Sequence, residues 1–223
     1  MARKEQFAEN EFYHIYNRGT DKRTIFLDEF DYGRFIRLLH VCNNQTAVVM
    51  KDLKNFNFSQ LTSLVSQYTP LVAIGAYCLM PNHFHILVKE IRPRGISQFM
   101  GKLLTAYSMY FNKKYERTGA LFEGKFKSSR AKNDNYLQYL FAYIHLNPVK
   151  LIDPNWKEEG IQDIEKAHSH LLQYPHSSYL DFTGEKRPEG AILNRDPDVF
   201  PAYFDNFKEF NEFIDAWLTY AEQ

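Results

Sequence analysis

Two adjoining apolar segments, residues 71–79 and 83–90, constrain the fold of this chain more than any other feature. The first is continuously apolar and bounded by Pro70 and Pro81, which is typical of a buried central strand. Pro81-Asn82 favours a tight turn, so residues 83–90 are expected to return antiparallel to the first strand. The rest of the chain must therefore cover a sheet that is built around this hairpin.

The second strand of this hairpin carries two histidines, His83 and His85. Side chains at i and i+2 of a strand project from the same face, so the two imidazoles lie side by side while Phe84 and Ile86 face the other way. Their ring nitrogens can converge on one ion, which makes half of a metal site. The alternative is a strand with two unrelated histidines, one of them buried and hydrogen-bonded.

Hydrophobic patterning places further elements on both sides of the hairpin. They are a strand at 11–18, a helix after the N-cap Asp28, a short helix around 59–68 inside a polar excursion at about 43–69, a long helix from Ser97, a strand at 125–131 and a helix at 135–147 capped by Asp134. The order β-α-β-β-α-β-α is that of a split βαβ, ferredoxin-like layer. We therefore predict an α+β fold, a ferredoxin-like split βαβ antiparallel sheet with helices packed on one face.

Length and composition limit the class of protein. The chain has 223 residues and is 44% hydrophobic, which fits one globular domain of about 1–150 followed by a mainly helical C-terminal extension at 151–223. Two cysteines form no disulfide framework, and the N-terminus has no apolar leader. The longest apolar stretch, about ten residues, is far shorter than a membrane span needs. We expect a cytoplasmic protein without membrane contact.

The charge is distributed unevenly although the net charge is zero. Residues 89–132 hold eleven Lys and Arg against three acidic residues, whereas residues 151–223 hold six against fifteen. This asymmetry predicts a basic working surface that suits a nucleic-acid backbone. The candidate DNA contacts are Arg18, Lys102, Lys113, Lys114, Lys125, Lys127 and Arg130. Tyr107, Tyr110 and Tyr115 offer rings for unpaired bases, but for Tyr107 a core position is the favoured interpretation.

Tyr143 and Asn147 lie four apart and so share one face of the last predicted helix. If this face meets the histidine-bearing sheet, Asn147 can add an amide oxygen to the ion and Tyr143 lies one turn away. A phenol becomes a nucleophile when a nearby base or positive charge favours the phenolate. Alternatively, Tyr143 is a core aromatic and Asn147 ends the helix before Pro148, which is the more frequent meaning of such a pair on its own.

Several segments, in order, resemble one known family. Pro-Asn-His-Phe-His-Ile-Leu at 81–87, the long helix, Gly-Lys-Phe-Lys-Ser-Ser at 124–129 and Tyr-Ile-His-Leu-Asn-Pro-Val at 143–149 are similar to the HUH-type single-tyrosine transposases, and more closely to the REP-associated tyrosine transposases of bacteria. Tyr-His-Ile-Tyr-Asn-Arg-Gly at 13–19 matches as well. The usual Trp-Ser-Ser-Tyr motif of that branch is here His-Ser-Ser-Tyr at 176–179, a departure that affects the packing of the tail.

The resemblance implies roles for particular residues. His83 and His85 are then paired metal ligands, Asn147 is the third protein ligand, and Tyr143 is the nucleophile that forms a 5′-phosphotyrosine. Amide, water and phosphate oxygens suit Mg²⁺ or Mn²⁺, which the family uses, whereas imidazoles alone would suit zinc. The implied partner is single-stranded DNA with a hairpin from a palindromic repeat. A monomer is favoured over a dimer.

Three functions remain open from the sequence. The preferred one is a metal-dependent enzyme that nicks and rejoins single-stranded DNA through Tyr143. The second is a catalytically inactive ferredoxin-like module that binds nucleic acid. The third is a metal-dependent hydrolase in which water attacks and no covalent intermediate forms.

Overall fold

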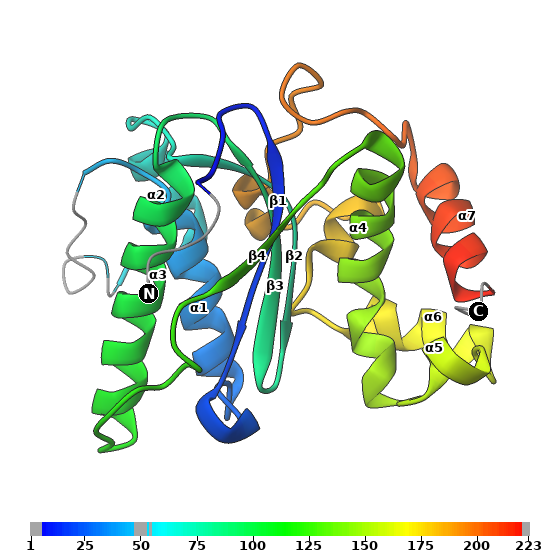
Figure 1. The fold of residues 1–223 in the computed structure, drawn as a ribbon, viewed down its shortest axis with the longest axis horizontal. Coiled ribbons are helices and arrows are strands. Elements are labelled where there is room, and N and C mark those ends of the chain that lie inside the picture. The colour runs from blue at the N-terminus through cyan, green and yellow to red at the C-terminus, as the bar shows by residue number, and fades with distance from the viewer. Residues whose placement is uncertain (1–5, 47–52, 54, 220–223) are drawn as a thin grey trace.

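A four-stranded antiparallel sheet in the order β2-β3-β1-β4 forms the centre of the computed structural model, which describes residues 6–46, 53 and 55–219 (Figure 1). The strands are β1 (Phe12–Arg18), β2 (Val72–Met80), β3 (His83–Glu90) and β4 (Lys127–Arg130). All four predicted strands are present, and this strand order is that of a ferredoxin-like sheet. β3 lies between β1 and β2, so the histidine-bearing strand is interior, as expected.

Two long helices cover one face of the sheet, namely α1 (Glu29–Val41) and α3 (Gly95–Lys114). The core on this side joins sheet residues such as Ile15 and Phe84 to Phe35 of α1 and Phe99 of α3, all fully buried. Asp28 caps α1 by accepting a hydrogen bond from the backbone of Asp31, as the sequence predicted. The short 3-10 helix η1 (Thr20–Lys22) precedes α1.

Helices also cover the opposite face, and here the expectation of helices on one face is wrong. α4 (Asp134–Leu146) packs on this second face through Leu137, Phe141 and Ile144, which share a buried cluster with Cys78 and Leu87 of the sheet. The reason is visible in β2, where all nine residues are buried, so neither of its faces can be left to solvent. The α+β class is confirmed, with α4 and the C-terminal extension as a third layer (Figure 1).

The polar excursion contains one short helix, α2 (Phe58–Val65), close to the predicted 59–68. Asn57 caps it, and Leu61 packs with Val41 and Leu53 in a small separate cluster. Residues 47–52 and 54 of the excursion lie outside the described residues.

The extension is mainly helical, as predicted. Its elements are η2 (Asn147–Leu151), α5 (Trp156–Glu159), α6 (Ile164–Gln173), η3 (Ser178–Phe182), η4 (Pro188–Ile192) and α7 (Phe207–Leu218). Its helices α5, α6 and α7 lie on the side of α4 that faces away from the sheet, whereas its later 3-10 segments return to β2 and to α1 and α2 (Figure 1). No helix in the described part of the chain is long and apolar enough to cross a membrane.

The His-Ser-Ser-Tyr segment joins the extension to the free edge of β2. The backbone carbonyl of His176 accepts from Leu79 at 2.9 Å, and the hydroxyl of Ser178 accepts from the backbone of Tyr77 at 2.9 Å. The His176 ring stacks on Tyr32 with centroids 3.6 Å apart. The His176 imidazole therefore packs on α1, and the segment covers an otherwise exposed sheet edge.

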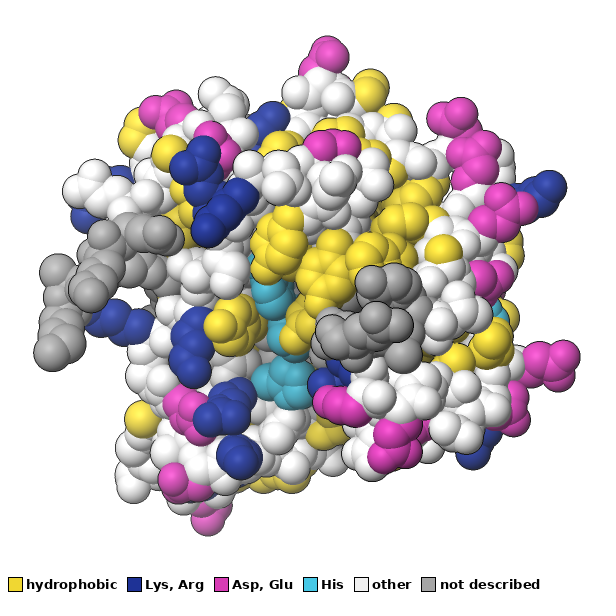
Figure 2. Space-filling view, turned by 45° about the vertical axis from the view of Figure 1, so that its right-hand side comes forward, with side chains coloured by type: hydrophobic (Ala, Val, Ile, Leu, Met, Phe, Trp, Pro, Cys, Tyr) yellow, Lys and Arg dark blue, Asp and Glu magenta, His cyan; other side chains and the backbone are white. Residues whose placement is uncertain are grey.

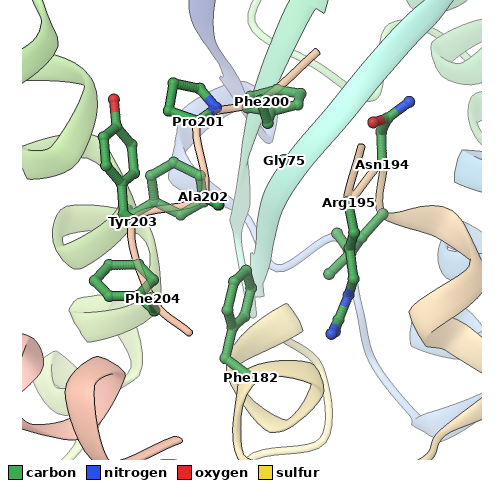
Figure 3. A pocket seen from close by; sticks show the side chains of 11 residues that line it. Gly75, Phe182, Asn194, Arg195, Phe200, Pro201, Ala202, Tyr203 and Phe204 are labelled. Carbon is green, nitrogen blue, oxygen red and sulfur yellow. The ribbon is translucent and has the colours of Figure 1, made fainter. Parts of the chain in front are cut away.

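A cavity of about 140 Å³ lies where the extension meets β2 (Figure 3). Tyr203 and Phe204 lie on one side of it and Asn194 and Arg195 on the other, with Phe182 between them. None of the residues that line this cavity is among the predicted site residues.

Candidate functional site

The two histidines of β3 lie on the face that α4 covers. Their ring centroids are 4.9 Å apart and the ring planes are perpendicular. His85 is buried and His83 is partly buried. The period of two along a strand therefore places them side by side, as expected. Figure 2 shows histidine side chains together at the surface of this face, with Lys and Arg side chains on both sides of them.

A third histidine, His14, holds His85 in place. His14 lies on β1, two residues before Tyr16, and Tyr16 is paired with His85 in the β1–β3 register. Side chains two apart on a strand share a face, so His14 and His85 lie on the same face of the sheet. Its Nε2 lies 2.8 Å from Nδ1 of His85. This hydrogen bond leaves Nε2 of His85 directed away from β1. The sequence interpretation missed His14. A histidine inside the strand predicted at 11–18, on the same face as Tyr16, was a usable signal.

The tautomer of His83 follows from its partner. Nδ1 of His83 lies 2.6 Å from the side-chain oxygen of Asn82, whose amide nitrogen donates to the carbonyl of Lys22. An amide oxygen only accepts, so Nδ1 of His83 carries the proton and Nε2 keeps its lone pair. The tight turn that begins the strand thus also fixes the ring of its first residue.

Burial keeps these imidazoles neutral. Desolvation, with smaller contributions from the nearby charges of Lys150 and Arg18, lowers the pKa of His83 to about 4. Desolvation likewise holds the pKa of His85 well below its usual value, with smaller contributions from His14 and His83. A neutral imidazole with a fixed tautomer is the form that binds a metal ion.

Tyr143 reaches this group from α4. Its ring centroid is 5.5 Å from that of His85 and 5.5 Å from that of His14, both in edge-to-face contact. The Tyr143 side chain is partly buried, whereas Leu137 and Ile144 of the same helix are in the core. α4 begins with Asn133 as its cap, one residue before the predicted Asp134.

A cation from the extension lies against this tyrosine. Nζ of Lys157 is 4.0 Å from the centroid of the Tyr143 ring, and Lys157 also lowers the pKa of His85. Lys157 belongs to α5, which the buried side chain of Trp156 anchors in the core of the extension. Together with Lys150, it forms a positive flank that the sequence interpretation missed, because Lys157 lies in the acidic part of the chain and Lys150 directly precedes that part.

Asn147 follows directly after α4 and is 3% exposed. Its amide nitrogen donates to the carbonyl of Tyr143 at 2.7 Å, so the side-chain oxygen is the atom it can offer to an ion. In the described part of the chain, no group of three or more His, Cys, Asp or Glu side chains is arranged to hold a metal. The ligand set predicted from the sequence consists of two imidazoles and an amide oxygen. It contains only two side chains of these four types, so it does not form such a group.

Four of the seven candidate DNA contacts bind protein groups. Arg18 pairs with Glu123 at 2.6 Å, and Arg130 pairs with Glu11 at 2.5 Å. Lys114 bridges Asp28 and Asp31 at 2.8 Å. Lys102 donates to the carbonyls of Asn44 and Thr46, the latter at 2.8 Å. These cations hold structural elements together, and a DNA phosphate would have to compete with their partners.

The other three candidates, Lys113, Lys125 and Lys127, are exposed. Lys127 lines a hollow of about 280 Å³ beside His83, together with Arg18, Lys22 and Tyr16. Basic side chains and an aromatic ring therefore adjoin the histidines on the β1–β4 side. Lys22, on η1, was another residue that the sequence interpretation did not single out.

The tyrosines predicted to stack on bases, Tyr107 and Tyr110 of α3 and its C-cap Tyr115, make contacts within the protein. Tyr107 is fully buried and its hydroxyl donates to the carbonyl of Ile25 at 2.5 Å, which confirms the core interpretation. The hydroxyls of Tyr110 and Tyr115 both donate to Asp31, at 3.0 and 2.8 Å. Tyr107 is therefore a core residue, as the favoured interpretation held, and Tyr110 and Tyr115 are held at Asp31 through their hydroxyls.

Comparison with known proteins gives one family. A model of the family described as "Transposase IS200 like" matches residues 31–147, which include His83, His85 and the whole of α4 but not His14. No curated protein matches the chain. Among solved structures, that of a REP-associated tyrosine transposase bound to a REP hairpin is similar, with 13% sequence identity and a TM-score of 0.48 over 85% of this chain and 90% of that one.

Proposed function

This chain belongs to the IS200-like transposase family, and on that premise we propose that it cleaves and rejoins single-stranded DNA through a covalent bond to Tyr143. The family match agrees with the resemblance to single-tyrosine transposases that the sequence motifs indicated. The REP-associated branch is supported by the Tyr-x-x-x-Asn pair at 143 and 147 and by the extension.

One observation carries the proposal. The side chain of Tyr143 lies within ring contact of His85 and His14, although more than fifty residues separate Tyr143 from His85 in the chain. A core tyrosine would be enclosed by apolar side chains. Here the ring instead meets two imidazoles and the ammonium group of Lys157, a setting that suits a reacting phenol.

The donor set fits a divalent ion. His83 and His85 would hold it through ring nitrogens that burial keeps unprotonated, and Asn147 would add its side-chain oxygen. With so few protein ligands, Mg²⁺ or Mn²⁺ would complete its shell with water and phosphate oxygens. When bound, such an ion polarises the phosphorus and offsets the charge that develops on the phosphate.

The reaction makes and breaks one bond in each step. The Oη atom of Tyr143 attacks the phosphorus and loses its proton to solvent, while the bond from phosphorus to the 3′ oxygen breaks and that oxygen takes up a proton. The 5′ side of the DNA then remains on Tyr143. Attack by another 3′ hydroxyl reverses the step and joins the strands without a nucleotide cofactor. The Lys157 ammonium group lies where it attracts the negative phosphate.

The proposed substrate is a DNA hairpin with an unpaired extension, the substrate type that the resemblance implies. Lys113, Lys125 and Lys127 are the predicted cations that we assign to its backbone, because their side chains are exposed. We retain a monomer as the working form, since the chain brings Tyr143 to the histidines without a second copy.

The test is to incubate the protein with an end-labelled hairpin and Mn²⁺ and to separate the products on a denaturing gel. We expect a protein–DNA adduct that survives denaturation and is absent with Tyr143→Phe. His83→Ala is expected to lose cleavage while keeping most of its affinity for the hairpin. Equal loss of cleavage and binding would make the histidines structural.

The same experiment separates the alternatives. Hairpin binding without cleavage by the unaltered protein would identify an inactive binding module. Cleavage without an adduct would identify a hydrolase that uses water. Either result would remove Tyr143 from the role of nucleophile.

A further inference from the structure

A fully buried histidine holds α4 from the side that faces away from the reaction site. His145 comes two residues after Tyr143 and two before Asn147, so its side chain points to the opposite side of the helix. It is 0% exposed and meets aromatic rings of the extension, with centroids 5.2 Å from Phe182 and 5.5 Å from Phe210. An apolar side chain would suit these surroundings, whereas a buried polar ring needs a hydrogen-bond partner.

The partner of this ring is a hydroxyl from the extension. Nε2 of His145 lies 2.8 Å from Oγ of Ser178, which belongs to the His-Ser-Ser-Tyr segment at 176–179. The same Oγ accepts from the backbone nitrogen of Tyr77 at 2.9 Å and donates to the carbonyl of Tyr77 at 3.2 Å. A hydroxyl has one proton and two lone pairs, so the three contacts use its full capacity when His145 donates. Ser178 therefore ties α4 to the edge strand β2.

This hydrogen bond supplies a constraint that the apolar contacts of α4 lack. Leu137, Phe141 and Ile144 pack the helix on the sheet, but apolar contact is non-directional and allows a helix to shift. A hydrogen bond depends on distance and angle, so it is made at one position of the helix. A helix displaced by one residue moves about 1.5 Å and turns about 100°, which would carry Tyr143 away from His85.

We propose that His145 and Ser178 are positioning residues, whose hydrogen bond fixes α4 so that its two predicted site residues meet the histidines of β3. Those two residues are Tyr143 and Asn147, with the roles that the proposed function gives them, and the inference rests on that function. The extension then takes part in the reaction, because it supplies the hydroxyl that holds the helix of the nucleophile.

His145→Phe removes the hydrogen bond and leaves no polar group orphaned, because Ser178 keeps both of its backbone partners at Tyr77. The phenyl ring suits the aromatic surroundings, so the midpoint of urea denaturation should stay close to that of the parent protein. The single-turnover rate of adduct formation should fall roughly 10- to 100-fold, since a displacement of about 1 Å at a reacting group is enough for such a loss. Hairpin affinity should not change.

Two further readouts do not depend on DNA cleavage. The affinity for Mn²⁺, followed by the electron paramagnetic resonance signal of the free ion, should fall roughly tenfold because the side-chain oxygen of Asn147 is displaced. Amide hydrogen exchange in the last turn of α4 should become faster, because this end of the helix loses its tie to β2. His145→Gln keeps an N–H donor at a similar reach and should restore the rate, the affinity and the exchange.

Phe210→Leu is the matched control, since Phe210 is fully buried and borders the ring of His145 without forming a hydrogen bond to it. It should lower the urea midpoint while leaving the single-turnover rate and the Mn²⁺ affinity unchanged. Loss of stability and loss of positioning are thereby assigned to different variants.

Two results would overturn the inference. One is that His145→Phe keeps the rate, the Mn²⁺ affinity and the hydrogen exchange of the parent protein, and the other is that His145→Gln is as impaired as His145→Phe. Failure of the proposed function is a separate result, in which the parent protein forms no adduct. The Mn²⁺ affinity and the hydrogen exchange of α4 then still decide whether this hydrogen bond positions the helix.

Discussion

Replacing His14 by phenylalanine tests whether the second histidine of β3 is held ready for an ion. The change removes the hydrogen bond of 2.8 Å between Nε2 of His14 and Nδ1 of His85 and keeps a ring of similar size on β1. His85 is 5% exposed, so no water replaces the lost partner easily. A metal ion on Nε2 of His85 requires the ring proton to be on Nδ1, and without His14 that proton is a buried donor with no acceptor, so the metal-binding tautomer is disfavoured.

The expected size of the effect follows from this tautomer change. Loss of the group that orients a histidine ligand typically reduces metal affinity about 10- to 100-fold, or about 1.4–2.7 kcal/mol. Titration with Mn²⁺, followed by the electron paramagnetic resonance signal of the free ion, measures this affinity without DNA cleavage. His14→Gln offers an amide oxygen as acceptor at a similar reach and should recover most of the affinity.

His40→Phe is the matched control for this substitution. His40 is buried like His14, and desolvation lowers the pKa of both to about 4, but His40 lies on α1 and stacks on Phe58. We expect His40→Phe to leave the Mn²⁺ affinity unchanged. If His14→Phe binds Mn²⁺ as tightly as His40→Phe does, the reasoning about His85 is refuted.

Three further predictions concern other parts of the molecule. Lys157→Met removes the cation over the Tyr143 ring and should slow adduct formation roughly tenfold, which corresponds to about 1.4 kcal/mol. Lys166→Met, at an exposed position of α6, should leave the rate unchanged, and equal single-turnover rates of the two variants would contradict this prediction. Arg187→Met leaves the fully buried carboxylate of Asp181 without its ion pair, so it should lower the free energy of unfolding by about 3–5 kcal/mol. Urea denaturation measures this change, and a loss below about 1 kcal/mol would contradict the prediction. Desolvation lowers the pKa of His40 from 6.5 to about 4, so between these pH values the unfolded chain binds a proton that the folded chain does not. The free energy of unfolding is therefore highest above pH 6.5 and falls by up to ~3 kcal/mol as the pH approaches 4. His40→Phe should flatten this decline in urea denaturation midpoints, and parallel curves for the two proteins would exclude the explanation.

The sequence by itself determined the local geometry of the site. Alternation along a strand placed His83 and His85 on one face, and the helical repeat placed Tyr143 one turn from Asn147. The turn at Pro81-Asn82 and the apolar residues 71–79 were sufficient to predict the central hairpin. These features follow from backbone periods of a few residues, so they require no knowledge of distant contacts.

Only the tertiary structure decided which distant groups meet at that site. The pairing of His14 with His85 depends on the β1–β3 register, and the approach of Lys157 to Tyr143 depends on how α5 packs on α4. The cations predicted to contact DNA were chosen from the sequence, which does not show the carboxylates that pair with them in the folded chain, such as Asp31 with Lys114. Composition shows that opposite charges exist, whereas long-range packing decides which of them pair, because desolvation and ion pairing act between segments far apart in the chain.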